Sequence, residues 1–181
     1  MKIGILTFHH SDNFGAVLQA LALQSLLLSW GHEVVILNHA AHRSPPWSQW
    51  RDPQGCFRKP GERVRGLIHG GKYRAEFARF RMESLHLTRL LPDLQTLSEA
   101  TRDLDMVLAG SDQVWHFSRE PRYFLQWNPP FPGKKVSYAA SCGSDVQPET
   151  DRSRIGSWIR SFHFVSVRDD FSAQLVRQVS G

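Results

Sequence analysis

The fold is decided by residues 2–31, KIGILTFHHSDNFGAVLQALALQSLLLSWG. This stretch opens with the apolar run Ile3–Phe8, passes through the polar bend His9–Asn13, and continues from Gly15 as a run rich in Ala and Leu. A buried strand, a tight loop and a buried helix in this order form the first half of a βαβ unit. Ligands of open α/β sheets bind beyond the carboxyl ends of the strands, so the loop 9–15 is the first candidate for chemistry.

Four further strands are predicted from short apolar, often β-branched runs. They are Val34–Leu37, Asp105–Ala109, Val136–Ala140 and Phe164–Val167. Helical periodicity predicts helices over 72–85, 94–100 and 148–160, and a last helix capped by Ser172. Strands that alternate with helices predict an α/β fold, a Rossmann-like doubly wound parallel sheet of about five strands in a single domain over residues 1–181.

A long segment between the second and third strands, residues 39–71, is rich in Pro, Gly and Arg and holds no regular strand pattern. Trp47, Trp50 and Phe57 interrupt its basic residues. The segment is interpreted as a basic loop. Two readings stay open: a binding loop that stacks on a sugar or meets an anionic surface, and plain disorder.

Composition limits the class of protein. The hydrophobic share of 41% and the charged share of 22% are ordinary for a globular domain. The sequence has neither a signal peptide pattern nor an apolar run of the ~20 residues that span a bilayer, so a cytoplasmic location is expected. Cys56 and Cys142 make no zinc or disulfide pattern, and no metal site is expected. The net charge of +5 favours anionic ligands, and peripheral contact with a membrane is compatible with it, but no nucleic-acid-binding motif is present.

Polar clusters follow the apolar strands. In a parallel sheet these clusters meet at one edge. The dinucleotide pattern G-x-G-x-x-G and the P-loop pattern are both absent, which disfavours a nucleotide cofactor. Asp and Asn side chains at such an edge suit a polyol, with His or Asp to take a proton from a hydroxyl. The candidates are His9, His10, Asp12 and Asn13 after the first strand, Gly110, Ser111, Asp112 and Gln113 after the third, Ser141 and Gly143 after the fourth, and Arg168 and Asp169 after the fifth.

Each candidate also has a structural interpretation. His9 and His10 can be held by backbone hydrogen bonds, and their spacing with Asp12 is a poor metal-ligand pattern. Asp12 and Asn13 can cap the following helix. Three more alternatives concern the later loops: Asp112 as the cap of a helix from Gln113, Trp115 as a core residue, and Arg168 as an ion-pair partner of Asp169 or Asp170.

Four blocks of sequence resemble the amino-terminal half of the polysaccharide pyruvyl transferase family. The blocks are residues 2–7 with 13–20 (NFGAVLQA), residues 110–115 (GSDQVW), residues 137–143 (SYAASCG) and residues 166–169 (SVRD). They stand in the family's order and span nearly the whole chain. The resemblance implies a fold like that of the B-type glycosyltransferases, in which two Rossmann-like domains face a cleft.

The resemblance also implies an activity: transfer of a pyruvyl group from phosphoenolpyruvate to two sugar hydroxyls, which gives a cyclic ketal. It implies phosphoenolpyruvate as co-substrate with no cofactor, and a glycan or lipid-linked sugar as acceptor. His10 or Asp112 is the expected proton carrier. The substrate-binding residues are expected to be His9, Asp12, Asn13, Gly15, Gln19, Gly110, Ser111, Gln113, Trp115, Ser141 and Arg168.

The resemblance implies that the donor is held largely by a second, carboxy-terminal domain. Residue 181 follows directly on a strand and a helix, as expected for the amino-terminal half of a two-domain protein. The alternatives are a non-catalytic module that binds sugars or assists assembly, and a glycosyltransferase domain that uses a nucleotide-sugar.

Overall fold

The computed structural model describes residues 1–39, 73–115, 121–143 and 149–180 of the chain. The predicted basic loop therefore lies outside the described residues, apart from its first residue, His39. The imidazole of His39 is buried, and its Nδ1 donates to the Leu91 carbonyl oxygen at 2.6 Å.

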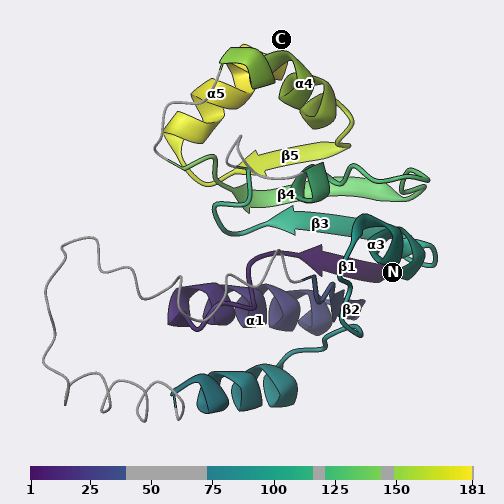
Figure 1. The fold of residues 1–181 in the computed structure, drawn as a ribbon, viewed down its shortest axis with the longest axis vertical. Helices are drawn as coiled ribbons and strands as arrows, with labels where there is room; N and C mark the ends of the chain where they lie inside the picture. The colour runs from purple at the N-terminus through teal and green to yellow at the C-terminus, as the bar shows by residue number, and fades with distance from the viewer. Residues whose placement is uncertain (40–72, 116–120, 144–148, 181) are drawn as a thin grey trace, which may run out of the picture.

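The predicted parallel sheet of five strands is confirmed (Figure 1). Its strands lie in the order β2-β1-β3-β4-β5, and every neighbouring pair runs parallel. This order is the flavodoxin-like variant of the doubly wound fold, in which the strand order reverses between the first and third strands. The strands are β1 (Lys2–Leu6), β2 (Glu33–Ile36), β3 (Met106–Gly110), β4 (Lys134–Ala140) and β5 (Phe164–Val167).

The four helices predicted before residue 165 agree with the structure to within one or two residues, the last helix begins earlier than predicted, and the 3-10 helix at 121–124 was not predicted. The helices are α1 (Phe14–Ser29), a helix over 73–84, α3 (Leu94–Thr101), the short 3-10 helix η2 (Pro121–Phe124), α4 (Glu149–Arg160) and α5 (Asp170–Ser180). One cap was misplaced. The α5 helix begins at Asp170, and Asp169 caps it by accepting from the Ser172 amide at 2.8 Å, so Ser172 lies inside the helix.

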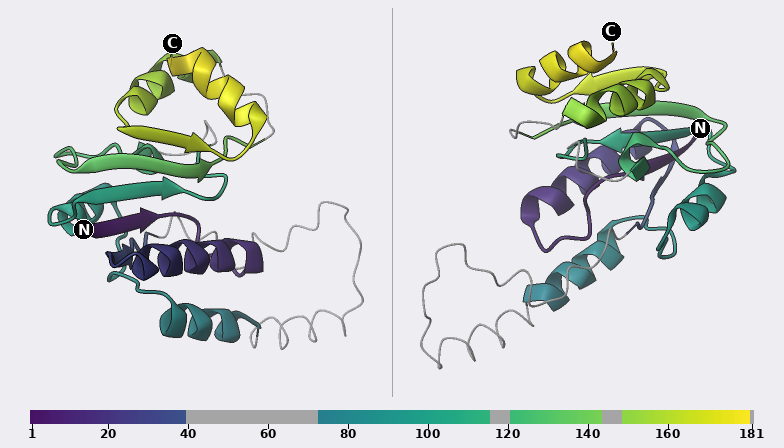
Figure 2. Two further views of the ribbon diagram at one scale, coloured as in Figure 1. Left: turned by 180° about the vertical axis from the view of Figure 1, so that it is seen from behind. Right: turned by 45° about the horizontal axis from the view of Figure 1, so that its top comes forward.

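Helices cover the sheet on both faces, as the two further views show (Figure 2). Ile3 and Ile5 of β1 pack on the side of α1, together with Leu85 after the 73–84 helix. Leu6 faces the opposite side, where α3, η2, α4 and α5 contribute to the larger apolar cluster. This alternation follows from the period of two along a strand, and it explains why β1 is apolar at nearly every position.

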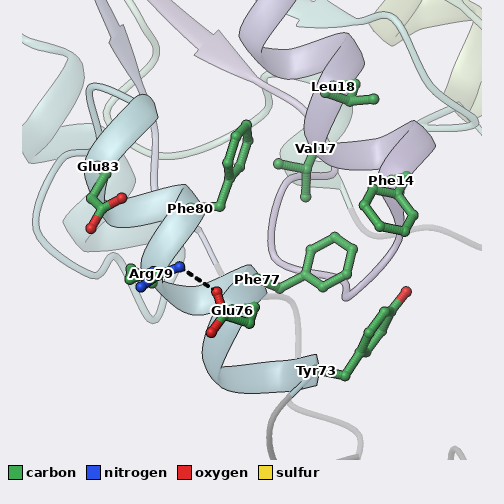
Figure 3. Close-up of a pocket in the computed structure, with 9 residues that line it drawn as sticks. All are labelled: Phe14, Val17, Leu18, Tyr73, Glu76, Phe77, Arg79, Phe80 and Glu83. Carbon is green, nitrogen blue, oxygen red and sulfur yellow. Dashed lines mark hydrogen bonds and ion pairs between the residues drawn. The ribbon is translucent and has the colours of Figure 1, made fainter.

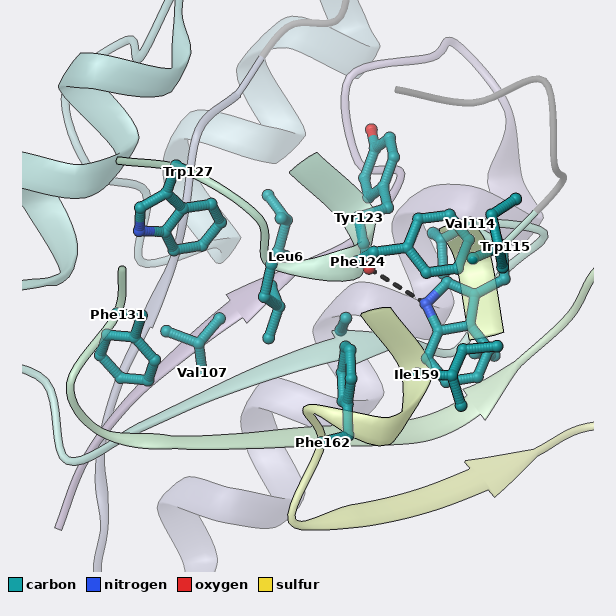
Figure 4. Packing of buried hydrophobic residues seen from close by; sticks show 14 of the residues in the cluster. Leu6, Val107, Val114, Trp115, Tyr123, Phe124, Trp127, Phe131, Ile159 and Phe162 are labelled. Carbon is teal, nitrogen blue, oxygen red and sulfur yellow. Dashed lines mark hydrogen bonds between the residues drawn. The ribbon is translucent and has the colours of Figure 1, made fainter. Parts of the chain in front are cut away.

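The larger cluster is rich in aromatic side chains (Figure 4). Trp115 is fully buried within it. Its ring stacks on Phe124 with centroids 5.6 Å apart, and its indole N–H donates to the Tyr123 carbonyl oxygen at 3.0 Å. This cluster anchors the segment that follows β3, and it therefore holds the carboxyl end of that strand in place.

Candidate functional site

An open polar pocket of about 390 Å³ lies at the carboxyl ends of β1 and β3. These are the two strands between which the sheet order reverses, the usual ligand position in doubly wound folds. The pocket draws its walls from the loop after β1, the first turns of α1, the loop after β3 and the end of β5. The lining residues are Phe8, Ser11, Asn13, Gly15, Ala16, Gln19, Ser111, Asp112, Gln113 and Arg168.

Gln19 connects the walls of this pocket. Its Nε2 donates to the Thr7 hydroxyl at 3.0 Å, to the Phe8 carbonyl oxygen at 3.0 Å and to the Ala16 carbonyl oxygen at 2.9 Å. Its Oε1 accepts a hydrogen bond from the Ser111 hydroxyl. A single amide thus ties the end of β1 and the start of α1 to the loop after β3.

The loop after β3 turns sharply at Gly110 and Ser111. A Cβ on Gly110 would lie 2.3 Å from the Tyr138 carbonyl oxygen, and φ is +133° there, so only glycine fits. Ser111 has a φ of 57°, in the left-handed region that residues with a side chain rarely adopt. Its amide donates to the Tyr138 carbonyl oxygen at 2.7 Å, which fixes the turn against β4.

Asp112 and Arg168 bring opposite charges to the pocket. The Asp112 carboxylate accepts from the Gln113 amide at 2.7 Å, and the Asp112 carbonyl oxygen accepts from the Ser141 amide at 3.0 Å. The backbone of Arg168 is held by its amide, which donates to the Ala140 carbonyl oxygen at 3.1 Å. The Arg168 guanidinium lies 3.9 Å from the Asp169 carboxylate, a loose and half-exposed ion pair. Both side chains are therefore available to a ligand.

Asn13 begins the wall formed by α1. It is the N-cap of that helix, and its Oδ1 accepts from the Ala16 amide at 3.1 Å. Of the two residues offered as caps from the sequence, Asn13 alone takes this role. Asp12 is instead paired with cations: its carboxylate lies 3.0 Å from the Arg81 guanidinium and 3.8 Å from that of Arg74.

The two histidines after β1 are not among the residues that line the pocket. His9 is buried, and its ring bonds to the Thr7 carbonyl oxygen and the Asn38 side-chain amide, each at 3.1 Å. Burial lowers the pKa of His9, because a charged ring loses its hydration there. Burial also lowers the pKa of His10 to about 4, with smaller effects from His9 and Arg81, and the buried His10 Nδ1 has no hydrogen-bond partner among the described residues.

A scan against protein-family models matches residues 13–181 to the model described as polysaccharide pyruvyl transferase. This match covers most of the chain, including the α1 wall, the loop after β3 and Arg168. The chain belongs to the polysaccharide pyruvyl transferase family. A comparison with curated proteins gave no match.

The pocket of this pyruvyl transferase family member gathers many of the residues that the sequence singled out. They are Asn13, Gly15, Gln19, Ser111, Asp112, Gln113 and Arg168. Phe8, Ser11 and Ala16 were not singled out, although they belong to the same strand-loop-helix stretch. Only their position could have indicated them, because any residue of a tight loop at a strand end can line a pocket there.

Other predicted binding residues lie elsewhere. Trp115 and Ser141 are buried and do not line the pocket, and His9, His10, Asp12 and Gly110 are also absent from its walls. The side chains of Trp115 and His9 are enclosed by protein and hydrogen-bonded to it, which is what their structural interpretations expect. Asp112 caps no helix at Gln113, because residues 111–115 form bends and a turn.

A second hollow, of about 320 Å³, lies between the first turns of α1 and the 73–84 helix (Figure 3). It is lined mainly by aromatic and aliphatic side chains, with Glu76, Arg79 and Glu83 at its edge. The sequence predicted that Tyr73, Phe77 and Phe80 pack in the core. Only Phe77 is buried; Tyr73 and Phe80 are 45% and 37% exposed and line this hollow, so the prediction was wrong for both.

Across the described ranges, no group of three or more His, Cys, Asp or Glu side chains is arranged to hold a metal ion. In the same ranges, no helix has the length and apolar character needed to cross a bilayer.

Proposed function

We propose that this chain provides the acceptor-binding part of a pyruvyl transferase, which moves a pyruvyl group from phosphoenolpyruvate to two hydroxyls of a glycan sugar. The observation that carries the proposal is the open polar pocket at the point where the sheet order reverses, with Asp112 and Arg168 in its walls. Polar oxygens and amides of this kind bind sugar hydroxyls, and the membership of the family supports the reaction.

The reaction sets the chemical demands on the pocket. One sugar hydroxyl attacks the enol carbon of phosphoenolpyruvate, the methylene carbon gains a proton, phosphate leaves, and the second hydroxyl closes the ketal. In the overall balance, one of the two hydroxyl protons is accounted for by the new methyl group. The other is carried away by the hydrogen phosphate that is released. A base beside the hydroxyls and a cation beside the phosphate or carboxylate would each lower the barrier.

Asp112 is the proposed base. Its carboxylate accepts a hydrogen bond from the Gln113 amide and lies in the pocket wall, without an ion pair among the described residues that would neutralise it. Asp12 is disfavoured for this task because two guanidinium groups already hold its carboxylate. His10 is the second candidate. Its neutral ring can accept a proton, but the ring does not line the pocket.

Arg168 is the proposed cation for the donor. Its backbone is anchored to the end of β4, and its loose contact with Asp169 leaves the guanidinium able to reach a phosphate or carboxylate oxygen. Further cations are proposed to come from a second Rossmann-like domain that faces this pocket, in the two-domain arrangement that the sequence resemblance implies. The acceptor would then lie on the side of Asn13, Gly15 and Ser111.

The proposal is tested with the complete protein that the gene encodes, incubated with phosphoenolpyruvate and lipid-linked or soluble glycans. The expected result is release of phosphate together with a glycan whose mass increases by the pyruvyl ketal. A glycan product formed only with a nucleotide-sugar would favour the glycosyltransferase alternative. Glycan binding without any transfer from either donor would favour the non-catalytic alternative.

A further inference from the structure

We infer that Gln19 is a positioning residue that holds the Ser111 hydroxyl as a hydrogen-bond acceptor, so that Ser111 and Asp112 together bind two hydroxyl donors of the acceptor. This inference rests on the proposed function and deepens it, because it assigns a positioning residue to the acceptor side of the pocket and a direction to the hydrogen bond between Gln19 and Ser111. Neither the family match nor the strand pattern implies it.

The orientation of the Gln19 amide is fixed by its surroundings. Its Nε2 faces the carbonyl oxygens of Phe8 and Ala16, which only accept hydrogen bonds, at 3.0 and 2.9 Å. A flipped amide would place Oε1 against both carbonyls and is therefore excluded. Oε1 must face Ser111, and because it cannot donate, the proton between them belongs to the serine.

The Ser111 hydroxyl therefore has its only proton committed to Gln19. Toward the pocket it can offer lone pairs and no donor. The next residue, Asp112, offers carboxylate oxygens, which are also acceptors. Two neighbouring acceptors favour a ligand with two O–H groups and disfavour phosphate or carboxylate oxygens at this position. Anions are expected on the side of Arg168 instead.

The backbone supports a role for the Ser111 side chain beyond that of a turn. At a φ of 57° glycine is less strained than any other residue, yet a serine stands here, directly after a glycine. Strained backbone of this kind clusters at active sites and ligand-binding sites, which is consistent with a role for Ser111 in the pocket. The turn itself does not require a hydroxyl group, and the hydroxyl is what distinguishes serine from alanine at this position.

The test compares Ser111→Gly, Ser111→Ala and Gln19→Met with the unchanged protein. The probes are myo-inositol, a panel of methyl glycosides and their monodeoxy analogues, and inorganic phosphate, with affinities measured by NMR titration. Ser111→Gly is expected to weaken binding of the preferred polyol about tenfold, equal to one hydrogen bond of about 1.4 kcal/mol, and to leave phosphate binding unchanged. Its melting temperature is expected to exceed that of Ser111→Ala, because glycine relieves the left-handed backbone.

Gln19→Met provides the sharper readout, since it should free the Ser111 proton to be donated. The ratio of phosphate affinity to polyol affinity is then expected to rise, and in the transfer assay the KM for the acceptor should rise more than the KM for phosphoenolpyruvate. If Gln19→Met does not fold, the two Ser111 variants decide alone.

Three results would count against the inference. Polyol affinity of Ser111→Gly equal to that of the unchanged protein would show that the serine acts only in the turn. An equal loss of polyol and phosphate affinity would contradict the assigned direction of the hydrogen bond. If the unchanged protein bound no polyol in the panel, the proposed acceptor site, and with it this inference, would be wrong.

Discussion

The loops that follow β1 and β3 carry similar polar residues at the same edge of the sheet, yet the carboxylate of Asp12 is paired with cations and that of Asp112 lies in the pocket wall. After β1, the side chains of His9 and Asp12 bond to other parts of the protein. After β3, the side chains of Ser111 and Asp112 line the open pocket. The comparison shows that residue type at a strand end does not decide function. What matters is where the partners of a side chain hold it: those of His9 and Asp12 hold it outside the pocket walls, whereas Gln19 holds the Ser111 hydroxyl in a wall.

The largest effect is expected for Asp112→Asn, which removes the proposed base and keeps the shape of the side chain. We expect the rate of ketal formation to fall by about 100-fold or more, the usual range for a general base. The melting temperature should stay within about 1 °C of the original, because the Asn oxygen can still accept from the Gln113 amide. Asp103→Asn, at an exposed position on the far end of the sheet, is the matched control.

Arg81→Met is expected to have the next largest effect, this time on stability. Arg81 is mostly buried and donates to both the Asp12 carboxylate and the Ser11 carbonyl oxygen. Its loss should lower the free energy of unfolding by about 1.5–3 kcal/mol, measured by urea denaturation. Glu76→Gln, which breaks an exposed pair with Arg79, should change it by less than about 1 kcal/mol. Equal losses would show that the Asp12 pair is no more structural than a surface pair.

Asn13→Ala should cost about 1 kcal/mol of stability, since it removes the cap of α1. Asn13→Asp keeps an accepting oxygen at the helix start and should preserve stability. Because Asn13 also lines the pocket, the alanine variant should in addition weaken acceptor binding. Full stability of Asn13→Ala would rule out the capping role.

The smallest effect is expected from the titration of His10. Its pKa is about 4 in the folded chain and 6.5 when unperturbed, so the unfolded chain takes up a proton first as the pH falls. Stability is thus complete above about pH 6.5 and is lost progressively toward pH 4. Because the ring is partly exposed, His10→Gln should reduce this loss by no more than about 1 kcal/mol. Thermal melts of both proteins at pH 7.5 and pH 5 measure this difference in the loss of stability. The difference should vanish if the His10 ring is hydrated in the folded chain.

Much of the fold was predictable from the sequence, because local patterns determine it. Apolar runs such as Ile3–Leu6 are too short for helices, and they lack the polar alternation of half-exposed strands. They therefore predict strands buried on both faces, as in the five-stranded parallel sheet. The exact strand order, which puts β1 beside β3, depends on packing between distant segments. The periodicity of apolar residues in the sequence does not determine that packing.

The location of the candidate site at the sheet edge could be predicted from the sequence more fully than the set of side chains that line it. Strand ends indicated Ser111, Asp112 and Arg168, which do line the pocket. Asp12 is neutralised by Arg74 and Arg81, which lie about 60 to 70 residues away along the chain. Nothing in the local sequence around Asp12 indicates them. The left-handed backbone of Ser111 likewise depends on contact with β4, which only the folded chain reveals.

The most direct test of the central claim is an amide NMR titration of the protein with the acceptor glycan. We predict that the shifted resonances belong to Asn13, Gly15, residues 111–113 and Arg168, with those of His9, His10 and Asp12 shifted less. Shifts confined to His9, His10 and Asp12, or to the hollow around Phe77 and Phe80, would contradict the account. Such a result would move the acceptor away from the loop after β3.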